Sequence, residues 1–251
     1  MTTSTRQSPE ESTLTLKADR ISKRFGGLRV FEGMSFELRL NEVLGVIGPN
    51  GAGKTTLINV ISGMLAPSSG RILLGGLDIS GKPLHAVSRR GVARTFQQTN
   101  TFGSASVEEN LYRARRFAGS MRGPDVPIDH LAEEFGLTRH MHERADQLPY
   151  GVQKMLGLII ALTARPRFLL MDEPAAGLER KERKYIDRFV ELAQEVLGCG
   201  VLLVEHDMDL VRRLCPHVLV LESGRLLAEG APADVLARQD VIDAYLGATE
   251  E

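Results

Sequence analysis

The stretch that most constrains this chain is a short apolar run that leads directly into a glycine-rich loop. The run is VLGVIG (43–48), the loop is GPNGAGKTT (48–56), and TTLINVIS (55–62) follows with helical spacing. Because the run does not alternate apolar and polar residues, it predicts a strand buried on both faces, as in a parallel sheet covered by helices. A buried strand, a glycine-rich loop and a helix in this order indicate an α/β fold.

The loop matches the pattern G-x-x-x-x-G-K-[ST] in full, which predicts a site for the phosphates of a nucleotide. Its glycines allow backbone N–H groups to face a phosphate, and the start of the following helix adds a favourable partial charge. Lys54 can reach the β and γ phosphates, and the Thr55 hydroxyl can coordinate Mg²⁺. A chance glycine-rich turn is the alternative, which the flanking strand and helix disfavour. The predicted binding residues are Gly48, Pro49, Asn50, Gly51, Ala52, Gly53, Lys54, Thr55 and Thr56.

Two further apolar runs end in polar residues that suit the same chemistry. FLLMDEP (168–174) contains Asp172 and Glu173, and GVLLVEHD (200–207) predicts a strand that ends at His206. Asp172 could hold Mg²⁺, Glu173 could polarise an attacking water, and His206 could hydrogen-bond to the γ phosphate or to that water. Each alone is more often a solvated residue at a strand end. Combined with the loop, they predict a site for phosphoryl transfer.

The composition restricts the location and the partners of the chain. Its 251 residues carry 31 Lys and Arg against 32 Asp and Glu, so charge does not point to nucleic acid or an anionic membrane. No uninterrupted apolar run reaches the roughly eighteen residues that a membrane span needs. Cys199 and Cys215 lack the spacing of a metal site and the density of a disulfide scaffold. We therefore expect a cytoplasmic chain with reduced thiols and no nucleic-acid partner.

The pattern also divides the chain into segments. Residues 1–12 are rich in Ser and Thr and predict a disordered tail, whereas residues 13–251 predict a single domain. The spacing is helical from about residue 99 to 155, which indicates a helical insertion in the α/β core. HVLVLESGRLLAEG (217–230) predicts two strands joined by a turn at Ser223 and Gly224.

These pieces in this order, with RTFQQ (94–98) before the helical insertion and LPYGVQK (148–154) after it, resemble the ATP-binding subunit of an ABC transporter. The resemblance covers nearly the whole chain after the tail. It implies an α/β fold with a RecA-like P-loop NTPase core, an N-terminal antiparallel β subdomain and an inserted helical subdomain. It also implies an ATPase with ATP and Mg²⁺ as cofactors.

Carried over by position, the resemblance assigns roles to more residues. Phe25 matches the aromatic residue that stacks on adenine. Gln97 matches a glutamine that contacts Mg²⁺ and faces a membrane subunit, and Gln98 is a weaker choice for that role. Residues 176–179 match a loop at the interface between two ATPase chains. The implied catalytic residues are Glu173, His206 and Gln97, and the implied metal ligands are Thr55, Gln97 and Asp172.

Finer features resemble the branched-chain amino-acid uptake group, namely GVARTFQ, MDEPAAGL, VEHDMDLV and DVIDAYLGA. Urea-uptake relatives share much of this pattern, so the solute stays open at this point. The resemblance implies a second ABC ATPase subunit, with a heteromeric pair favoured, two transmembrane permease subunits and an extracytoplasmic solute-binding protein. It also implies a peripheral position on the inner face of the cell membrane.

LPYGVQK departs from the signature LSGGQ, which in the resembled family closes over the ATP of the other chain. Pro149 replaces the serine and Val152 replaces a glutamine, while Tyr150 is shared with the branched-chain group. Proline suits the start of a helix, but one lost charge-assisted hydrogen bond costs about 1.5–3 kcal/mol. We predict a weakened signature, and a soluble or regulatory ABC-type ATPase with weak turnover is the alternative. The residues predicted to act on the partner's nucleotide are Leu148, Pro149, Tyr150, Gly151, Val152 and Gln153.

Overall fold

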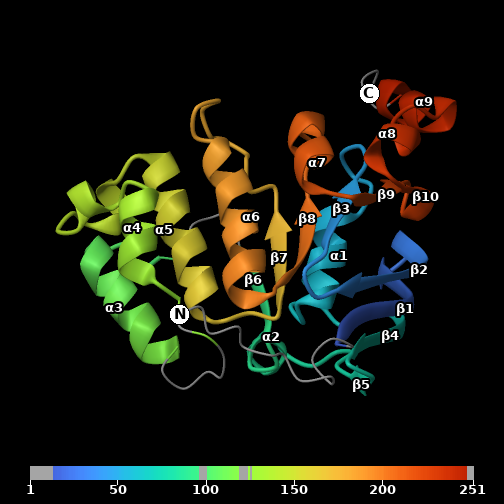
Figure 1. Cartoon of the computed structure of the whole chain (residues 1–251). Helices are drawn as coiled ribbons and strands as arrows, with labels where there is room; N and C mark the ends of the chain where they lie inside the picture. The colour runs from blue at the N-terminus through green and yellow to red at the C-terminus, as the bar shows by residue number, and fades with distance from the viewer. Residues whose placement is uncertain (1–13, 96–100, 119–123, 125, 248–251) are drawn as a thin grey trace, which may run out of the picture.

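A six-stranded, mainly parallel sheet forms the centre of the protein (Figure 1). The computed structural model describes residues 14–95, 101–118, 124 and 126–247. The sheet has the order β10-β9-β3-β8-β7-β6, and every neighbouring pair is parallel except the β9–β10 hairpin, which turns at Ser223 and Gly224 as predicted. Its strands are β3 (Val43–Ile47), β6 (Val92–Thr95), β7 (Phe168–Asp172), β8 (Gly200–Val204), β9 (His217–Glu222) and β10 (Arg225–Gly230).

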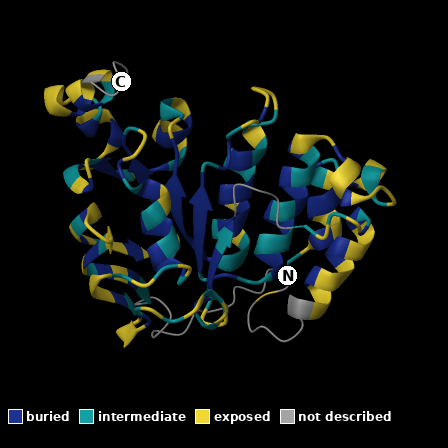
Figure 2. Ribbon diagram, turned by 180° about the vertical axis from the view of Figure 1, so that it is seen from behind, coloured by how far each residue is buried: buried dark blue, intermediate teal, exposed yellow. Residues whose placement is uncertain are grey.

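The central strands are buried on both faces, as the uninterrupted apolar runs predict. Every residue of β3, β7 and β8 is buried, and Figure 2 shows these strands in dark blue inside the molecule. Successive residues face opposite sides: Leu169 and Met171 belong to one hydrophobic cluster, and Phe168 and Leu170 to the other. Burial of each such side chain contributes about 1.5–3 kcal/mol. The sheet is therefore the middle layer of three.

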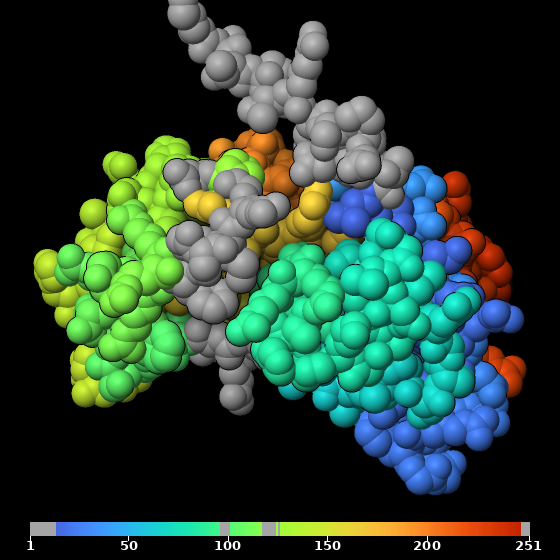
Figure 3. All heavy atoms as spheres, turned by 90° about the horizontal axis from the view of Figure 1, so that it is seen from below, coloured from blue at the N-terminus to red at the C-terminus, as the bar shows by residue number. Residues whose placement is uncertain are grey.

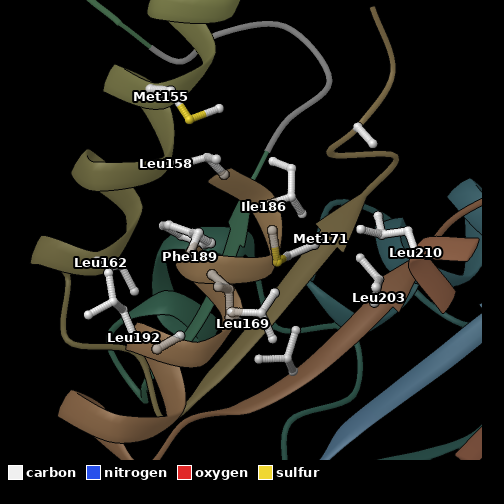
Figure 4. Close-up of a cluster of buried hydrophobic side chains, with 14 of the residues drawn as sticks. Met155, Leu158, Leu162, Leu169, Met171, Ile186, Phe189, Leu192, Leu203 and Leu210 are labelled. Atoms are coloured by element: carbon white, nitrogen blue, oxygen red, sulfur yellow. The ribbon is translucent and has the colours of Figure 1, made fainter. Parts of the chain in front are cut away.

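Helices cover one face of this sheet, and a second sheet with further helices covers the other. The first cover consists of α5 (Tyr150–Thr163), α6 (Lys184–Leu197) and α7 (Met208–Leu214), whose side chains meet Leu169, Met171 and Leu203 of the strands (Figure 4). The other cover contains α1 (Lys54–Ile61) and α2 (Leu84–Ser88). The carboxyl ends of β3, β7 and β8 are thereby left at one edge, between the two covers.

The second sheet is antiparallel and has the strand order β2-β1-β4-β5. Register shifts between Ala18 and Ile21 let β1 bend without ending, so it continues as one long strand from Thr15 to Phe25. The sequence pattern does not predict the short strands β4 and β5 that follow α1. The sheet consists of β1 (Thr15–Phe25), β2 (Leu28–Arg39), β4 (Ser69–Leu74) and β5 (Leu77–Asp78). With the parallel core, it confirms the predicted fold class.

The helical part lies at the opposite end of the molecule from the antiparallel sheet (Figures 1 and 3). It contains α3 (Val107–Ala118), α4 (Ile128–Glu134), two 3-10 turns (Thr138–His140 and Ala145–Gln147) and the start of α5. The helical spacing expected from about residue 99 to 155 is interrupted after α4, because Gly136 takes a φ of 71° there and ends the helix. The boundary expected near residue 155 falls inside α5.

Two short helices, α8 (Pro232–Val235) and α9 (Gln239–Gly247), complete the described chain. Across the described ranges, none of the helices combines the length and the apolar character that a membrane crossing requires. Cys199 and Cys215 are buried free thiols, and burial raises the pKa of both. The predicted tail and Gln97 lie outside the described residues.

Candidate active site

The glycine-rich loop joins β3 to α1 and depends on glycine at two points. Gly48 has a φ of 148°, and a Cβ there would lie 2.0 Å from the carbonyl oxygen of Leu221. Gly53 has a φ of 99° and directly precedes α1, with the carbonyl of Val30 3.2 Å from the Cβ position. No other residue fits this path without strain. The backbone is thus folded into the shape that a phosphate-binding loop needs.

Lys54 is buried at the first turn of α1, where it is 7% exposed. Its Nζ donates to the carbonyl oxygens of Gly48 at 2.7 Å and Pro49 at 2.9 Å. Burial lowers the pKa of Lys54, and the charges of Glu173 and Asp172 oppose that shift. The ammonium group therefore lies inside the curve of the loop, close to two carboxylates.

Asp172 ends β7 and faces both the loop and β6. The Thr55 hydroxyl donates to its Oδ1 at 3.4 Å, and an Arg94 nitrogen donates to its Oδ2 at 3.0 Å. Burial raises the pKa of Asp172, and the positive charge of Arg94 opposes that shift. Arg94 also donates to the side chain of Asn59. The motif RTFQQ alone indicates no role for Arg94, but a charged residue next to buried strand positions needs a partner, and that need is a signal in the sequence.

These groups fit a magnesium ion that is bound together with phosphates. No group of three or more His, Cys, Asp or Glu side chains in the described part of the chain could hold a metal ion by itself. Mg²⁺ usually takes one or two protein oxygens and completes its shell with phosphate oxygens and waters. The neighbouring oxygens of Thr55 and Asp172 supply that kind of partial set.

Glu173 and His206 meet because β7 and β8 are parallel neighbours, with Asp172 paired to Val204. Nδ1 of His206 lies 4.0 Å from Oε1 of Glu173, and the His206 side chain is 61% exposed. The prediction that strand β8 ends at His206 is wrong, because the strand ends at Val204 and the chain then turns. That turn places the imidazole ring toward solvent, beside the Glu173 carboxylate.

The segment 148–153 forms the beginning of α5. Pro149 is the residue before the helix, with φ −54° and ψ 145°, and its carbonyl accepts from the N–H of Gln153 at 3.0 Å. Its missing N–H therefore interrupts no bond inside the helix. Leu148 is buried, and its carbonyl accepts from the Gln153 side chain at 2.9 Å. Tyr150 donates to the Ala176 carbonyl at 3.4 Å.

The remaining signature positions differ in exposure. Gly151 is buried, and a Cβ there would lie 2.2 Å from Oε1 of Glu182, so glycine leaves room for that carboxylate. Val152 is half-buried and lines a cavity of about 190 Å³ with Met155 and Tyr185. The replaced glutamine position thus faces this cavity.

Phe25 stands at the end of β1, in the hairpin with β2, and is 46% exposed. Nζ of Lys23 lies 4.8 Å from the centre of its ring. On the same hairpin, the carbonyl of Val30 approaches both Gly53 and the Cβ position of Gly224. The hairpin therefore borders the loop, and an exposed aromatic ring lies at its tip.

Tyr245 of α9 reaches the loop from the C-terminal side of the chain. Burial raises its pKa to about 12, and a hydrogen bond with the backbone of Gly48 opposes that shift. The surrounding pattern DVIDAYLGA resembles the branched-chain group but indicates no role for the tyrosine. No sequence signal brings position 245 to position 48, because only the fold joins them.

Comparisons with known proteins agree with this geometry. The family model described as ABC transporter matches residues 31–176, and a model described as branched-chain amino acid ATP-binding cassette transporter matches residues 225–251. The branched-chain amino acid transport ATP-binding protein BraF of Pseudomonas aeruginosa is 36% identical, over 92% of this chain and 97% of that protein. The lipopolysaccharide export system ATP-binding protein LptB of Escherichia coli is 32% identical, over 93% of this chain and 97% of that protein.

A solved structure shares the arrangement as well. An ATP-binding cassette of an ABC transporter in its ADP conformation superposes with a TM-score of 0.78 at 28% identity, covering 93% of this chain and 99% of that one. The ABC transporter model alone matches more than half of the chain, and the relatives are matched over almost their whole length. The chain therefore belongs to the ABC transporter family, as an ATP-binding cassette that hydrolyses ATP.

Proposed function

We propose that the chain holds ATP and Mg²⁺ on the loop 48–56 and hydrolyses ATP there to drive amino-acid uptake. The observation that carries this proposal is the convergence of Lys54, Thr55, Asp172, Glu173 and His206 at the carboxyl ends of β3, β7 and β8. A buried ammonium, a hydroxyl beside a carboxylate, and a second carboxylate beside an imidazole together form a set suited to phosphoryl transfer to water.

Each side chain then has one task. Lys54 exchanges the carbonyls of Gly48 and Pro49 for phosphate oxygens, which are stronger acceptors because they are charged. Glu173 accepts a proton or a hydrogen bond from the attacking water, and His206 donates to the γ phosphate or orients that water. When bound, Mg²⁺ neutralises charge that develops on the phosphates.

Arg94 keeps Asp172 charged and in place. Its ion pair with Asp172 at 3.0 Å keeps the carboxylate paired while Thr55 donates only a long bond. A buried carboxylate is costly without a counter-charge. We therefore assign Arg94 the task of holding Asp172 ionised and in place for the metal. Gln97, three residues later and outside the described residues, keeps its proposed contact with that metal.

The second half of the site comes from another chain. The start of α5 carries an exposed Tyr150 beside Pro149, and a helix N-terminus attracts phosphate. We propose that this end closes over the ATP of a second ABC ATPase subunit, whose own signature closes over the ATP bound here. Because Pro149 offers neither a hydroxyl nor an N–H, a heteromeric pair with an unaltered partner is favoured.

Uptake of branched-chain amino acids is the transport reaction that the likenesses favour. BraF is named for such transport, and the C-terminal residues 225–251 match a model of that type. LptB is named for export at 32% identity, so likeness along the cassette alone does not set the direction. We propose two permease subunits and an extracytoplasmic binding protein as partners, with the chain peripheral on the inner face of the membrane.

The first experiment measures ATP hydrolysis by the purified chain as its concentration is raised, with Lys54→Ala as the blank. Specific activity that climbs with concentration supports a site shared by two copies. Blank-level activity with intact ATP binding means that another subunit must complete the site, and binding at blank level contradicts the proposal.

The solute is tested in cells that lack the chain. Accumulation of labelled leucine should be restored by the wild-type chain and not by Lys54→Ala. If neither the wild-type chain nor Lys54→Ala raises leucine accumulation above that of the cells without the chain, amino-acid uptake is contradicted. ATP hydrolysis by the chain is not affected by that result. The regulatory alternative predicts ATP binding with weak or negligible turnover in every assembly, and in the sequence only Pro149 favours it.

A further inference from the structure

A buried lysine holds the backbone that follows strand β7. Lys154 lies on the second turn of α5 and is 5% exposed. Its Nζ donates to the carbonyl oxygen of Ala176 at 2.8 Å and to that of Glu173 at 3.2 Å. One side chain thus ties both ends of the segment 173–176 to the helix that begins with the signature.

A buried glutamate holds the same segment through a backbone N–H group. Glu205 is fully buried, and its carboxylate accepts from the N–H of Ala175 at 2.8 Å and from that of His206 at 3.1 Å. A carboxylate that accepts two backbone N–H bonds is well satisfied in an apolar interior. Glu205 therefore joins the segment 173–176 to the loop that carries His206.

The charge of Glu205 also favours the charged form of Lys154. Burial lowers the pKa of Lys154, and the charge of Glu205 is the first of two that oppose this shift, with Glu173 second. A buried charge is costly without a counter-charge, so removal of Glu205 takes away the larger of the two charges that favour a charged Lys154. Lys154 thus depends on Glu205 for its charge, and both side chains bind the same segment.

The segment that they hold needs such support. Glu173 has a φ of 47°, in the left-handed region that residues other than glycine seldom adopt. Such a conformation costs roughly 1–3 kcal/mol and persists only where the surroundings fix it. The direction of the Glu173 carboxylate, 4.0 Å from His206, depends on that backbone conformation.

We propose that Lys154 and Glu205 form a buried clamp, which positions Glu173 and His206 and connects both to the signature helix α5. The inference rests on the hydrolytic roles proposed above for Glu173 and His206. Neither clamp residue contacts the substrate, so both are positioning residues. A shift of the first turns of α5, where a partner's nucleotide would dock, passes through Lys154 to the carbonyl of Glu173.

The first test needs no activity. Hydrogen exchange is followed at the amides of Ala175 and His206 in the full nucleotide-free chain, as wild type, Lys154→Met and Glu205→Gln. Both variants should exchange about tenfold faster at these two amides, because the amides open when the clamp is lost. Amides of α1 serve as the internal control. Unchanged exchange at Ala175 in Lys154→Met overturns the clamp, since the two side chains then act independently.

The second test separates positioning from folding. Lys154→Met and Glu205→Gln should each lower kcat about tenfold, while ATP affinity stays within about twofold of the wild type. Lys154→Arg should lose less kcat than Lys154→Met. The double variant should lose less kcat than the product of the two single losses. Asn110→Leu is the matched control, because Asn110 is buried and its carboxamide bonds the carbonyls of Phe102 and Ser106 away from the site. It should lower the melting temperature and keep kcat.

If Asn110→Leu lowers kcat and the melting temperature as much as the clamp variants do, the positioning role is overturned. It is also overturned if the clamp variants lose ATP affinity but keep kcat. If the wild-type chain hydrolyses no ATP in any assembly, the proposed function fails instead. The exchange measurement still decides on the clamp in that case.

Discussion

Two buried lysines, Lys54 and Lys154, have nearly the same surroundings and opposite expected behaviour. Each donates to two backbone carbonyls, and burial lowers the pKa of each. The carbonyls bound by Lys54 belong to its own loop, five and six residues away. Those bound by Lys154 lie 19 and 22 residues away in another segment. We therefore expect Lys54 to exchange its carbonyl partners for a ligand, and Lys154 to keep its partners and hold the backbone around the ligand's site.

The comparison teaches that a buried charge has to be judged by what its partners are free to do. The carbonyls of Gly48 and Pro49 lie on a loop that a phosphate enters, so a stronger acceptor can replace them. The carbonyls of Glu173 and Ala176 belong to the segment after β7 and accept from Lys154 of α5, and no ligand replaces them in the proposed mechanism. Four changes break or sharpen this contrast, beginning with the largest expected effect.

Lys54→Ala should reduce ATP hydrolysis about a thousandfold and should weaken ATP binding as well. The loss of one preorganised donor at a reacting group costs roughly a hundred- to a thousandfold, and the lost phosphate contact adds the binding effect. Turnover and the equilibrium affinity for a fluorescent ATP analogue are measured on the same preparation. Lys154→Met is the counterpart that should keep the affinity. Equal affinity losses in the two variants would erase the distinction between the lysines.

Glu173→Gln should lower hydrolysis about a hundredfold and leave ATP affinity unchanged. Glutamine keeps the shape of the side chain but is no base, and positioned general bases contribute roughly a hundred- to ten-thousandfold. Single-turnover hydrolysis measures the chemical step, and the exchange of the Ala175 amide shows whether the segment stays in place. If Glu173→Gln turns over ATP like the wild type, another group is the catalytic base. The clamp formed by Lys154 and Glu205 would then position a residue that does not act in catalysis.

Pro149→Ser should raise turnover of the assembled transporter by about tenfold or more. The serine restores a hydroxyl worth about 1.5–3 kcal/mol when it acts on a charged group, and the effect reaches the rate only if it is made in the transition state. Steady-state hydrolysis is compared in assemblies that contain the wild-type chain or the variant. Val152→Gln, the other change toward the usual signature, is measured beside it and shows which of the two replacements weakens the signature. A rate that stays equal or falls contradicts the weakened signature.

The sequence allowed a correct prediction of what depends on neighbouring residues. The buried strand β3, the loop and α1 follow each other directly, so periodicity and glycine spacing were sufficient for that unit. The pattern VEHD predicts the end of strand β8 two residues too late, because it contains no strand breaker. The turn after Val204 depends instead on Glu205, which accepts backbone N–H groups.

Residues whose partners are distant in sequence could not be predicted in the same way. Arg94 binds Asp172 across 78 positions, and Glu205 binds Ala175 across 30. In the sequence each reads as an isolated charge near a motif. Their roles depend on which strand ends the sheet order brings together, and that order is a property of the whole fold.

The smallest effect is expected at Tyr245, which extends the contrast to a third group at the loop. Its phenol is hydrogen-bonded to the backbone of Gly48, the residue at which the loop begins. Tyr245→Phe removes that bond and keeps the packing of the ring, and one net hydrogen bond is worth about 1 kcal/mol. ATP affinity should therefore fall about fivefold, with kcat unchanged at saturation. Tyr185→Phe is the control, because Tyr185 packs on Phe135 in the helical part and should leave affinity as it is. If Tyr245→Phe binds ATP like the wild type, α9 supports the fold without shaping the loop. If kcat falls as well, Tyr245 acts in the manner of Lys154, by holding a catalytic backbone in place.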